Sequence, residues 1–134
     1  MPNRLDASSI YSNEHSPDEA LSGDGYFCSK KYDVPVHWWM EFQEPTVIGT
    51  IHLKEVHSGC TYDFWGCNGT INKDDNFGCT GTKVILMSGT REKLMETPSL
   101  YNALFNVYGL TATKLGSRKY MAIKFYFYYG NLDN

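Results

Sequence analysis

"VPVHWWMEFQEPTVIGTIHL", residues 34–53, is the stretch that decides the fold. Residues 36–42 alternate between two faces, as the side chains of a β-strand do, and Glu44-Pro45 interrupts the pattern. A second strand is predicted over residues 47–56. One face of the first strand carries Trp38, Met40 and Phe42, and the other carries His37, Trp39 and Glu41. Two neighbouring strands of this kind indicate a sheet rather than a helix bundle.

The adjacent tryptophans raise the question of whether they bind a ligand or fill the core. A tryptophan on a central strand buries a large apolar area and finds a partner for its indole N–H. We therefore predict a structural role for Trp38. Trp39 points to the opposite face and receives no assignment, and His37 is interpreted as a hydrogen-bonded strand residue rather than a ligand.

The rest of the chain extends the β pattern. Residues 82–87 (TKVILM) predict a buried strand and residues 119–129 (KYMAIKFYFYY) a long strand, whereas 101–108 is ambiguous. Residues 16–21 and 91–95 predict single helical turns, the first with Ser16 as its N-cap. The 10 tyrosines, 7 phenylalanines and 12 glycines also favour strands and turns. We predict an all-β sandwich, with residues 1–134 as one domain.

Charge and hydropathy exclude several function classes. The net charge is -3 and the lysines and arginines are scattered, so we do not expect a nucleic-acid partner. No apolar run approaches the roughly 20 residues that span a bilayer, and the polar N-terminus predicts no signal peptide. The sequence also lacks a G-x-S-x-G, Walker or HExxH motif, so an enzyme is not predicted.

The four cysteines, Cys28, Cys60, Cys67 and Cys79, allow two interpretations. An even number in a small, loop-rich chain favours two disulfides with three possible connectivities, whereas a cytosolic protein would keep the thiols reduced. We favour Cys60–Cys79 and Cys28–Cys67. Asn68-Gly69-Thr70 is a glycosylation sequon, meaningful if the chain is secreted.

Residues 57–80 show no periodicity and are interpreted as a long cross-linked loop. At its predicted tip, between Gly59 and Gly66, lie the candidate ligand-binding residues. These are Tyr62, Asp63, Phe64 and Trp65, with His57 and Lys54 nearby. Exposed rings of this kind stack on sugars or insert into lipid headgroups. The alternative is that Phe64 and Trp65 fold back into a small satellite core.

The order of the motifs resembles the discoidin, or coagulation factor C-type, domain, whose plan the F-type fucose-binding lectins share. The resemblance covers roughly residues 8–90, with a weaker echo at 118–125. It is carried by "EALSGDG" (19–25), "HWWMEF" (37–42), "TVIGTIHL" (46–53), the cysteine-bearing loop and "GTKVILMSG" (81–89). It implies a jelly-roll β-sandwich of the galactose-binding-like superfamily, with ligand-binding loops at one end. Because the chain ends in "GNLDN", the family's last strand is expected to be missing or replaced by another element.

The resemblance also suggests a cation and a sugar. Asp24 lies in the turn that contributes calcium ligands in the resembled lectins, although Ser22 replaces the usual aspartate. No other cofactor is expected. None of the arginines falls in the loop after the strand 46–53, so the fucose specificity does not carry over.

The predicted function is therefore a non-catalytic extracellular or cell-surface binding module, secreted or part of a larger extracellular protein, with a glycan or glycoprotein as partner. The alternative is a cell-adhesion module that uses the aromatic loop to bind protein or a phospholipid membrane surface. A purely structural domain of an extracellular or viral assembly is the third possibility.

Overall fold

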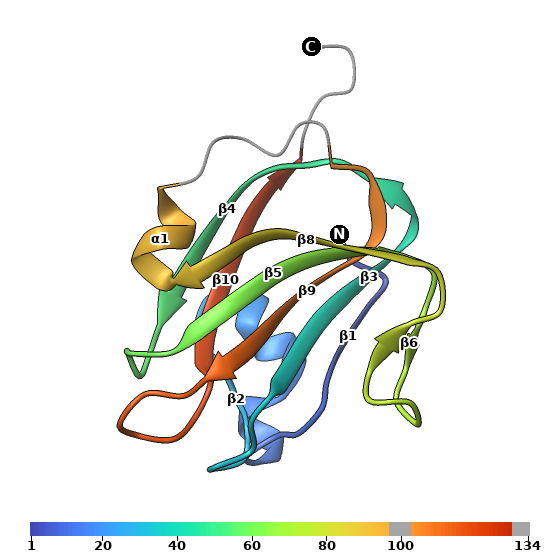
Figure 1. The fold of residues 1–134 in the computed structure, drawn as a ribbon. Helices are drawn as coiled ribbons and strands as arrows, with labels where there is room; N and C mark the ends of the chain where they lie inside the picture. Colours follow the sequence, from blue (N-terminus) through green and yellow to red (C-terminus); the bar gives the residue numbers. More distant parts are fainter. Residues whose placement is uncertain (97–102, 130–134) are drawn as a thin grey trace.

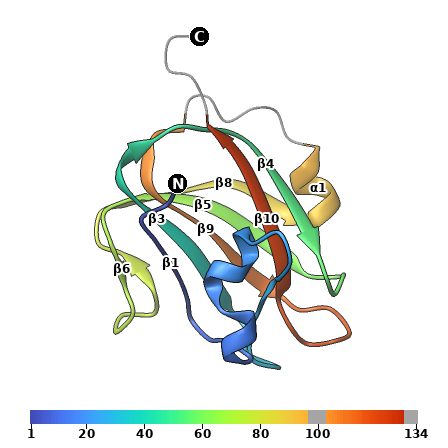
Figure 2. The ribbon, with the colours of Figure 1, turned by 180° about the vertical axis from the view of Figure 1, so that it is seen from behind.

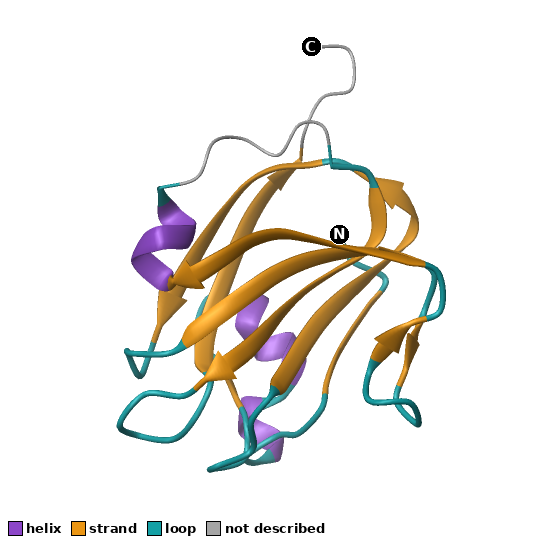
Figure 3. Cartoon of the chain, in the orientation of Figure 1, coloured by secondary structure: helices purple, strands orange, loops and turns teal. Residues whose placement is uncertain are grey.

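Two antiparallel sheets face each other in this chain, for which a computed structural model describes residues 1–96 and 103–129. Figure 1 and Figure 3 show the layers. The larger sheet has the order β1 (Arg4–Ala7), β3 (Val36–Thr46), β9 (Phe105–Lys114), β5 (Thr61–Asn68) and β8 (Thr82–Thr90). The smaller has the order β2 (Phe27–Cys28), β10 (Ala122–Tyr129) and β4 (Ile48–Glu55). The predicted all-β sandwich is confirmed.

Short helices close the two flanks of the sandwich. The 3-10 helix η2 (Pro17–Leu21) contacts β1 and β10, and α1 (Arg91–Met95) contacts β8 and β4. A second 3-10 turn, η1 (Asn13–His15), precedes η2. Both predicted helical turns are thus present, and Ser16 occupies the N-cap position of η2. None of the helices in the described ranges is long and apolar enough to cross a membrane.

The strand boundaries correct the sequence predictions in three places. The last strand begins at Ala122 rather than 119, because Lys119 has a left-handed backbone with φ of 65°. The strand predicted as buried over 82–87 is the edge strand β8, where Val84 and Ile85 are 40% and 50% exposed. The ambiguous stretch 101–108 enters β9 at Phe105, and its first two residues lie outside the described residues. Residues 130–134, where the family's last strand was expected to be missing, lie outside them as well.

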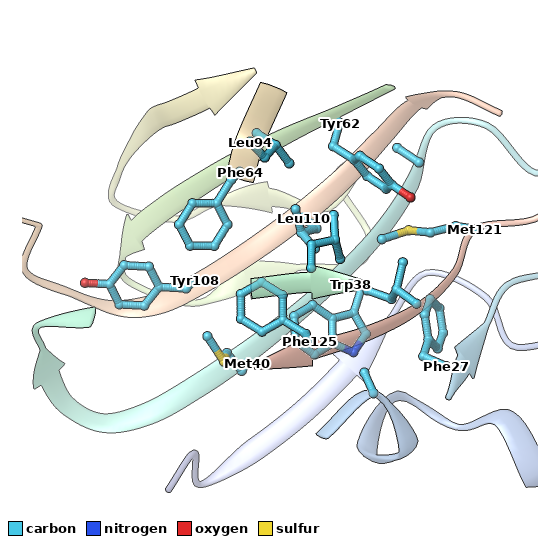
Figure 4. Close-up of a cluster of buried hydrophobic side chains, with 14 of the residues drawn as sticks. Phe27, Trp38, Met40, Tyr62, Phe64, Leu94, Tyr108, Leu110, Met121 and Phe125 are labelled. Carbon is cyan, nitrogen blue, oxygen red and sulfur yellow. The ribbon is translucent and has the colours of Figure 1, made fainter. Parts of the chain in front are cut away.

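Trp38 has the structural role that the sequence predicted. It is fully buried between the sheets, with its ring 5.2 Å from that of Phe125 (Figure 4). Its indole Nε1 donates a hydrogen bond of 3.0 Å to the backbone carbonyl of Pro17. This bond ties the core to η2, which leads into the loops at one end of the sandwich. The other core side chains labelled in Figure 4 come from both sheets, and Leu94 comes from α1.

The largest correction concerns residues 57–80, which do not form a structureless loop. Residues 61–68 are β5, which lies between β9 and β8 in the larger sheet. A hairpin of β6 (Ile71–Asn72) and β7 (Gly78–Cys79) follows and folds over the outer face of that sheet. Asn106 holds the base of the hairpin, because its side-chain amide bonds both the N–H and the carbonyl of Gly69.

The hairpin covers a second small core on the outer face of the larger sheet. Its members are Trp39, Trp65, Cys67 and Val107, with Ile71, Phe77 and Cys79 packed against them. The ring of Phe77 stacks on His37 at 5.2 Å and lies 6.0 Å from the ring of Trp39. Trp39 is therefore structural too, which answers the question that its position left open.

Trp65 fits this small core only because β9 carries a glycine beneath it. The indole lies over Gly109, where any Cβ would overlap the ring. Trp65 Nε1 then donates to Thr111 Oγ1 at 2.9 Å. Thr111 Oγ1 is also 2.8 Å from Nδ1 of His37. Since the threonine hydroxyl accepts from Trp65, it can donate to a neutral His37. Burial lowers the pKa of His37 to about 4, and the charge of Lys83 acts in the same direction.

The disulfide prediction is wrong in both pairs. Cys67 of β5 bonds Cys79 of β7, with their Cα atoms 6.0 Å apart, whereas Cys28 and Cys60 are free and buried. The predicted pairing assumed that 60–79 was a loop closed at its base. Because Cys67 instead sits on the outer face of a strand, it faces the returning hairpin. One disulfide pins the hairpin to the sheet.

Reduction of the intact protein should raise its mass by only two hydrogen atoms. Alkylation of the denatured, unreduced protein should label two of the four cysteines. Replacing Cys67 and Cys79 by serine should lower the free energy of unfolding by roughly 3 kcal/mol on the chain-entropy model for a loop of this length. A mass gain of four hydrogens would contradict the observed pairing.

Gly109→Ala should destabilise the fold, because the added methyl displaces the Trp65 indole. The expected loss is about 1–3 kcal/mol of unfolding free energy, measured by chemical denaturation. Gly23→Ala is the matched control, since an added Cβ there meets nothing within 4 Å. Equal stability of the two variants would show that the Trp65–Gly109 contact is unimportant.

Candidate functional site

Four connections meet at one end of the sandwich, the lower end in Figures 1 and 2. They are residues 8–26 with η1 and η2, 29–35, 56–60 and 115–121. Loops that converge on a rigid β-scaffold are a common place for a binding site, because the loops vary while the sheets hold them. We call this end the loop end.

A pocket of about 150 Å³ opens at the loop end. It is lined by Tyr11, His15, Tyr26, Cys28, His57 and Tyr120. Its volume is below the roughly 300–1,000 Å³ of pockets for drug-sized ligands, which suits a small group such as one monosaccharide. We call it the loop-end pocket.

The five rings of the pocket contact one another. Tyr11 meets Tyr120 edge to face with centroids 5.4 Å apart, and His15 lies 4.4 Å from Tyr26. His57 lies 5.8 Å from Tyr120 on the other side. These rings come from three separate connections, 8–26, 56–60 and 115–121, so the pocket exists only when the sandwich is folded.

Backbone hydrogen bonds hold these connections to the strands. Tyr11 N–H donates to the carbonyl of Cys28 at 2.8 Å, which aligns the first connection with β2. Ser29 N–H donates to Met121 at 2.9 Å, and Val56 N–H donates to Ala122 at 2.8 Å. All three bonds lie within two residues of a pocket-lining side chain. The lining residues are therefore positioned by the sheet and not by free loops.

The polar groups of the pocket stay neutral donors and acceptors where their environment is known. Partial desolvation raises the pKa of the Tyr120 hydroxyl, and the Tyr11 and Cys28 side chains raise it further. Burial raises the pKa of the Cys28 thiol to about 11, so it remains protonated at the pocket floor. Nδ1 of His15 lies 3.3 Å from the carbonyl of Tyr26 and donates a hydrogen bond to it.

The predicted aromatic loop tip is wrong. Tyr62, Phe64 and Trp65 are at most 1% exposed, because β5 is covered by the opposite sheet on one face and by the hairpin on the other. Tyr62 donates its hydroxyl to Glu55 at 2.7 Å. Asp63 lies on the outer face and accepts from Ser88 Oγ at 2.6 Å. The alternative, a small satellite core, is correct for Trp65, whereas Phe64 lies in the main core between the sheets. The predicted membrane-inserting loop therefore has no exposed rings among these three residues.

The other predicted site residues are dispersed. His57 lines the loop-end pocket, whereas Lys54 is exposed on β4, paired with Lys124 of β10. Asp24 is exposed, and the described residues contain no group of three His, Cys, Asp or Glu side chains placed to hold a metal ion. Asp24 therefore belongs to no cluster of such side chains that could form the suggested calcium site among the described residues. Asn68 is exposed at the end of β5, so its glycosylation stays a prediction.

Sequence reasoning found only His57 among the pocket residues. Tyr11, His15, Tyr26 and Tyr120 lie in segments that share no motif and are separated by up to about a hundred residues. His15 directly precedes the predicted helical turn 16–21 and Tyr120 lies at the start of the predicted strand 119–129, whereas Tyr11 and Tyr26 stand next to no predicted element. Which of these residues meet in space depends on the sheet order, which the spacing does not give.

Comparisons with solved structures identify the fold. The chain is similar to chitosan-binding module 1 of a chitosanase/glucanase from Paenibacillus sp. IK-5, with a TM-score of 0.76, 13% identity and coverage of 96% of each chain. It is also similar to the family 32 carbohydrate-binding module of C. perfringens NanJ in complex with galactose (TM-score 0.66, 14% identity, coverage 92% and 91%). A third similar structure is the family 32 module of AlyQ with 4,5-unsaturated mannuronic acid (TM-score 0.68, 9% identity, coverage 96% and 95%).

No protein-family model matches the chain, and no curated protein matches it in sequence. The structural likeness confirms the β-sandwich that the discoidin resemblance implied, since the chain shares the architecture of these carbohydrate-binding modules. At these identities it establishes the architecture alone.

Because all three tryptophans are buried, the native protein should have a blue-shifted tryptophan emission that iodide quenches weakly. Unfolding in denaturant should shift the emission to longer wavelengths and expose it to quencher. Strong iodide quenching of the tryptophan emission of the native protein would instead indicate that Trp65 is exposed, as the sequence predicted. The same burial means that ligand binding at the loop-end pocket should leave tryptophan emission nearly unchanged.

Proposed function

We propose that this chain is a non-catalytic carbohydrate-binding module whose ligand, a sugar residue of a glycan or glycoprotein, occupies the loop-end pocket. The observation that carries the proposal is the cluster of five aromatic rings around a pocket of monosaccharide size. The similar structures support it, since their names describe chitosan-binding, galactose-bound and mannuronate-bound modules.

The pocket supplies the two kinds of contact that sugar recognition needs. Exposed ring faces stack against the C–H groups of a pyranose and bury apolar area. The tyrosine hydroxyls and histidine nitrogens offer hydrogen bonds to the sugar hydroxyls. A tyrosine hydroxyl is protonated at neutral pH, and desolvation raises the pKa of Tyr120 further, so this hydroxyl can donate as well as accept.

A non-catalytic role fits the chemistry of the lining residues. Glycoside hydrolysis requires two carboxyl groups across the bond that is cleaved. The six lining side chains include none. The thiol of Cys28 has a raised pKa and so lacks the thiolate that a nucleophile needs.

We further propose that the module acts outside the cell, as a secreted protein or as a domain of a larger extracellular or cell-surface protein. The Cys67–Cys79 disulfide supports this location, because such bonds persist in oxidising compartments. The sequon at exposed Asn68 is available for a glycan there. A role in cell adhesion would follow from glycoprotein binding by the same pocket.

Tyr120→Ala and Tyr11→Ala should each weaken glycan binding at least tenfold in a glycan array or by calorimetry, because each removes a ring that lines the pocket. Tyr128→Ala, which removes an exposed ring from β10 at a distance from the loop end, is the matched control. Loss of binding in the control with retention in the pocket variants would place the site elsewhere. A folded wild-type protein with no signal on a broad array would overturn the proposal.

A further inference from the structure

The rim of the loop-end pocket is positively charged on one side. The ammonium group of Lys31 lies 5.8 Å from the ring centroid of Tyr120 and 5.7 Å from that of Tyr32. Cation–π contacts at this range hold the lysine over the ring that lines the pocket. Arg118 stands two residues before Tyr120, and its charge opposes the rise in the pKa of the Tyr120 hydroxyl. Two cations thus act on one pocket side chain.

The two loops that carry these cations are bonded to each other. Tyr32 N–H donates to the carbonyl of Lys119 at 2.9 Å, and Lys119 N–H donates to Gly116 at 3.0 Å. Both Tyr32 and Lys119 have left-handed backbones, with φ of 62° and 65°. The two turns therefore support each other and fix the cations beside the pocket.

The charge of this wall contrasts with that of the whole chain. Residues 29–35 and 115–121 carry four cations, Lys30, Lys31, Arg118 and Lys119, and one carboxylate, Asp33. The electrostatic influence of Asp33 falls on His37. The whole chain has 12 lysines and arginines against 15 acidic residues, so positive charge is concentrated at this wall.

The acidic residues near the loop end do not line the pocket. Glu14 is exposed on η1 beside His15, and Glu19 packs its carboxylate against Gly25. Asp18 and Asp24 are exposed on and after η2. Glu55, at the end of β4, accepts hydrogen bonds from the Cys60 N–H and the Tyr62 hydroxyl. A ligand in the pocket would meet aromatic rings on its faces and the ammonium group of Lys31 along one edge.

We infer that the loop-end pocket selects a sugar of the uronic acid class, with its carboxylate directed to Lys31 and Arg118 as specificity-determining residues. The inference rests on the proposed function and adds the charge of the ligand. A guanidinium and an ammonium recognise a carboxylate through charge-assisted hydrogen bonds, which are about twice as strong as neutral ones.

The test measures binding of matched pairs of methyl glycosides by calorimetry. Each pair differs only at C6: galacturonate and galactose, mannuronate and mannose, glucuronate and glucose. For the preferred pair we expect the uronate to bind about tenfold more tightly in low salt, and the advantage should shrink as salt screens the charges.

Two variants assign the effect to the named residues. Lys31→Met keeps most of the length of the side chain and removes its charge, and Arg118→Gln removes the charge of the guanidinium and keeps a shorter polar side chain. Each should reduce uronate binding about 2–5-fold, the range for partly exposed ion pairs, and leave the neutral sugar unchanged. Lys73→Met, in the hairpin that covers the outer face of the larger sheet, should change neither.

Equal binding of a uronate and its hexose would overturn this inference and leave the proposed function standing. A uronate preference that survives in both variants would overturn the assignment to Lys31 and Arg118. Failure of every sugar to bind the folded wild-type protein would overturn the proposed function together with the inference.

Discussion

The structure depends on burial of β5 on both of its faces. Tyr62 and Phe64 enter the core between the sheets, while Trp65 and Cys67 enter the small core under the hairpin. Burial on both faces requires a glycine at two positions where a large side chain contacts the backbone. Gly109 leaves room for the indole on β9, and Gly66 leaves room for the ring of Phe105. A strand buried on both sides cannot shift its register, because a slip of one residue would exchange the two sets of side chains. The larger sheet is therefore a rigid base for the loops attached to it.

This rigidity reaches the loop end through particular bonds. The Trp38 indole holds the backbone of Pro17, and the strand-end hydrogen bonds hold the segments around Tyr11, His57 and Tyr120. The pocket rings are thus placed before a ligand arrives, and less side-chain entropy is lost on binding. Preformed aromatic surfaces are what a weakly hydrophobic ligand such as a sugar requires. The small core and the disulfide lie at a different part of the molecule, where they stabilise the sheet and leave the pocket open.

The sequence predicted the scaffold well where one face of a strand is buried and the other is not. The strand predicted over 47–56 is β4, whose residues Thr50, His52 and Lys54 are exposed, and the paired signals of Ser16 and Pro17 located η2. The prediction failed for β5, because Tyr62, Phe64, Trp65 and Cys67 are all buried and leave no alternation to detect. Because β5 was predicted to be a loop, its aromatic residues were expected to be exposed. The predicted ligand-binding site was therefore placed on residues that are buried. The disulfide prediction was wrong for the same reason, because it placed Cys67 on a loop rather than on a strand. The pocket joins residues from three connections and from β2, so it could be located only after the order of the strands was known.

The most direct test of the account is to record amide chemical shifts by NMR while the protein is titrated with a galacturonate glycoside, or with the sugar that binds most tightly. The account predicts shifts that saturate together in residues 8–35, 56–60 and 115–121, with the amides of the hairpin 71–79 and of β5 unmoved. Saturable shifts centred on β5 or on the hairpin, with the loop end silent, would contradict it.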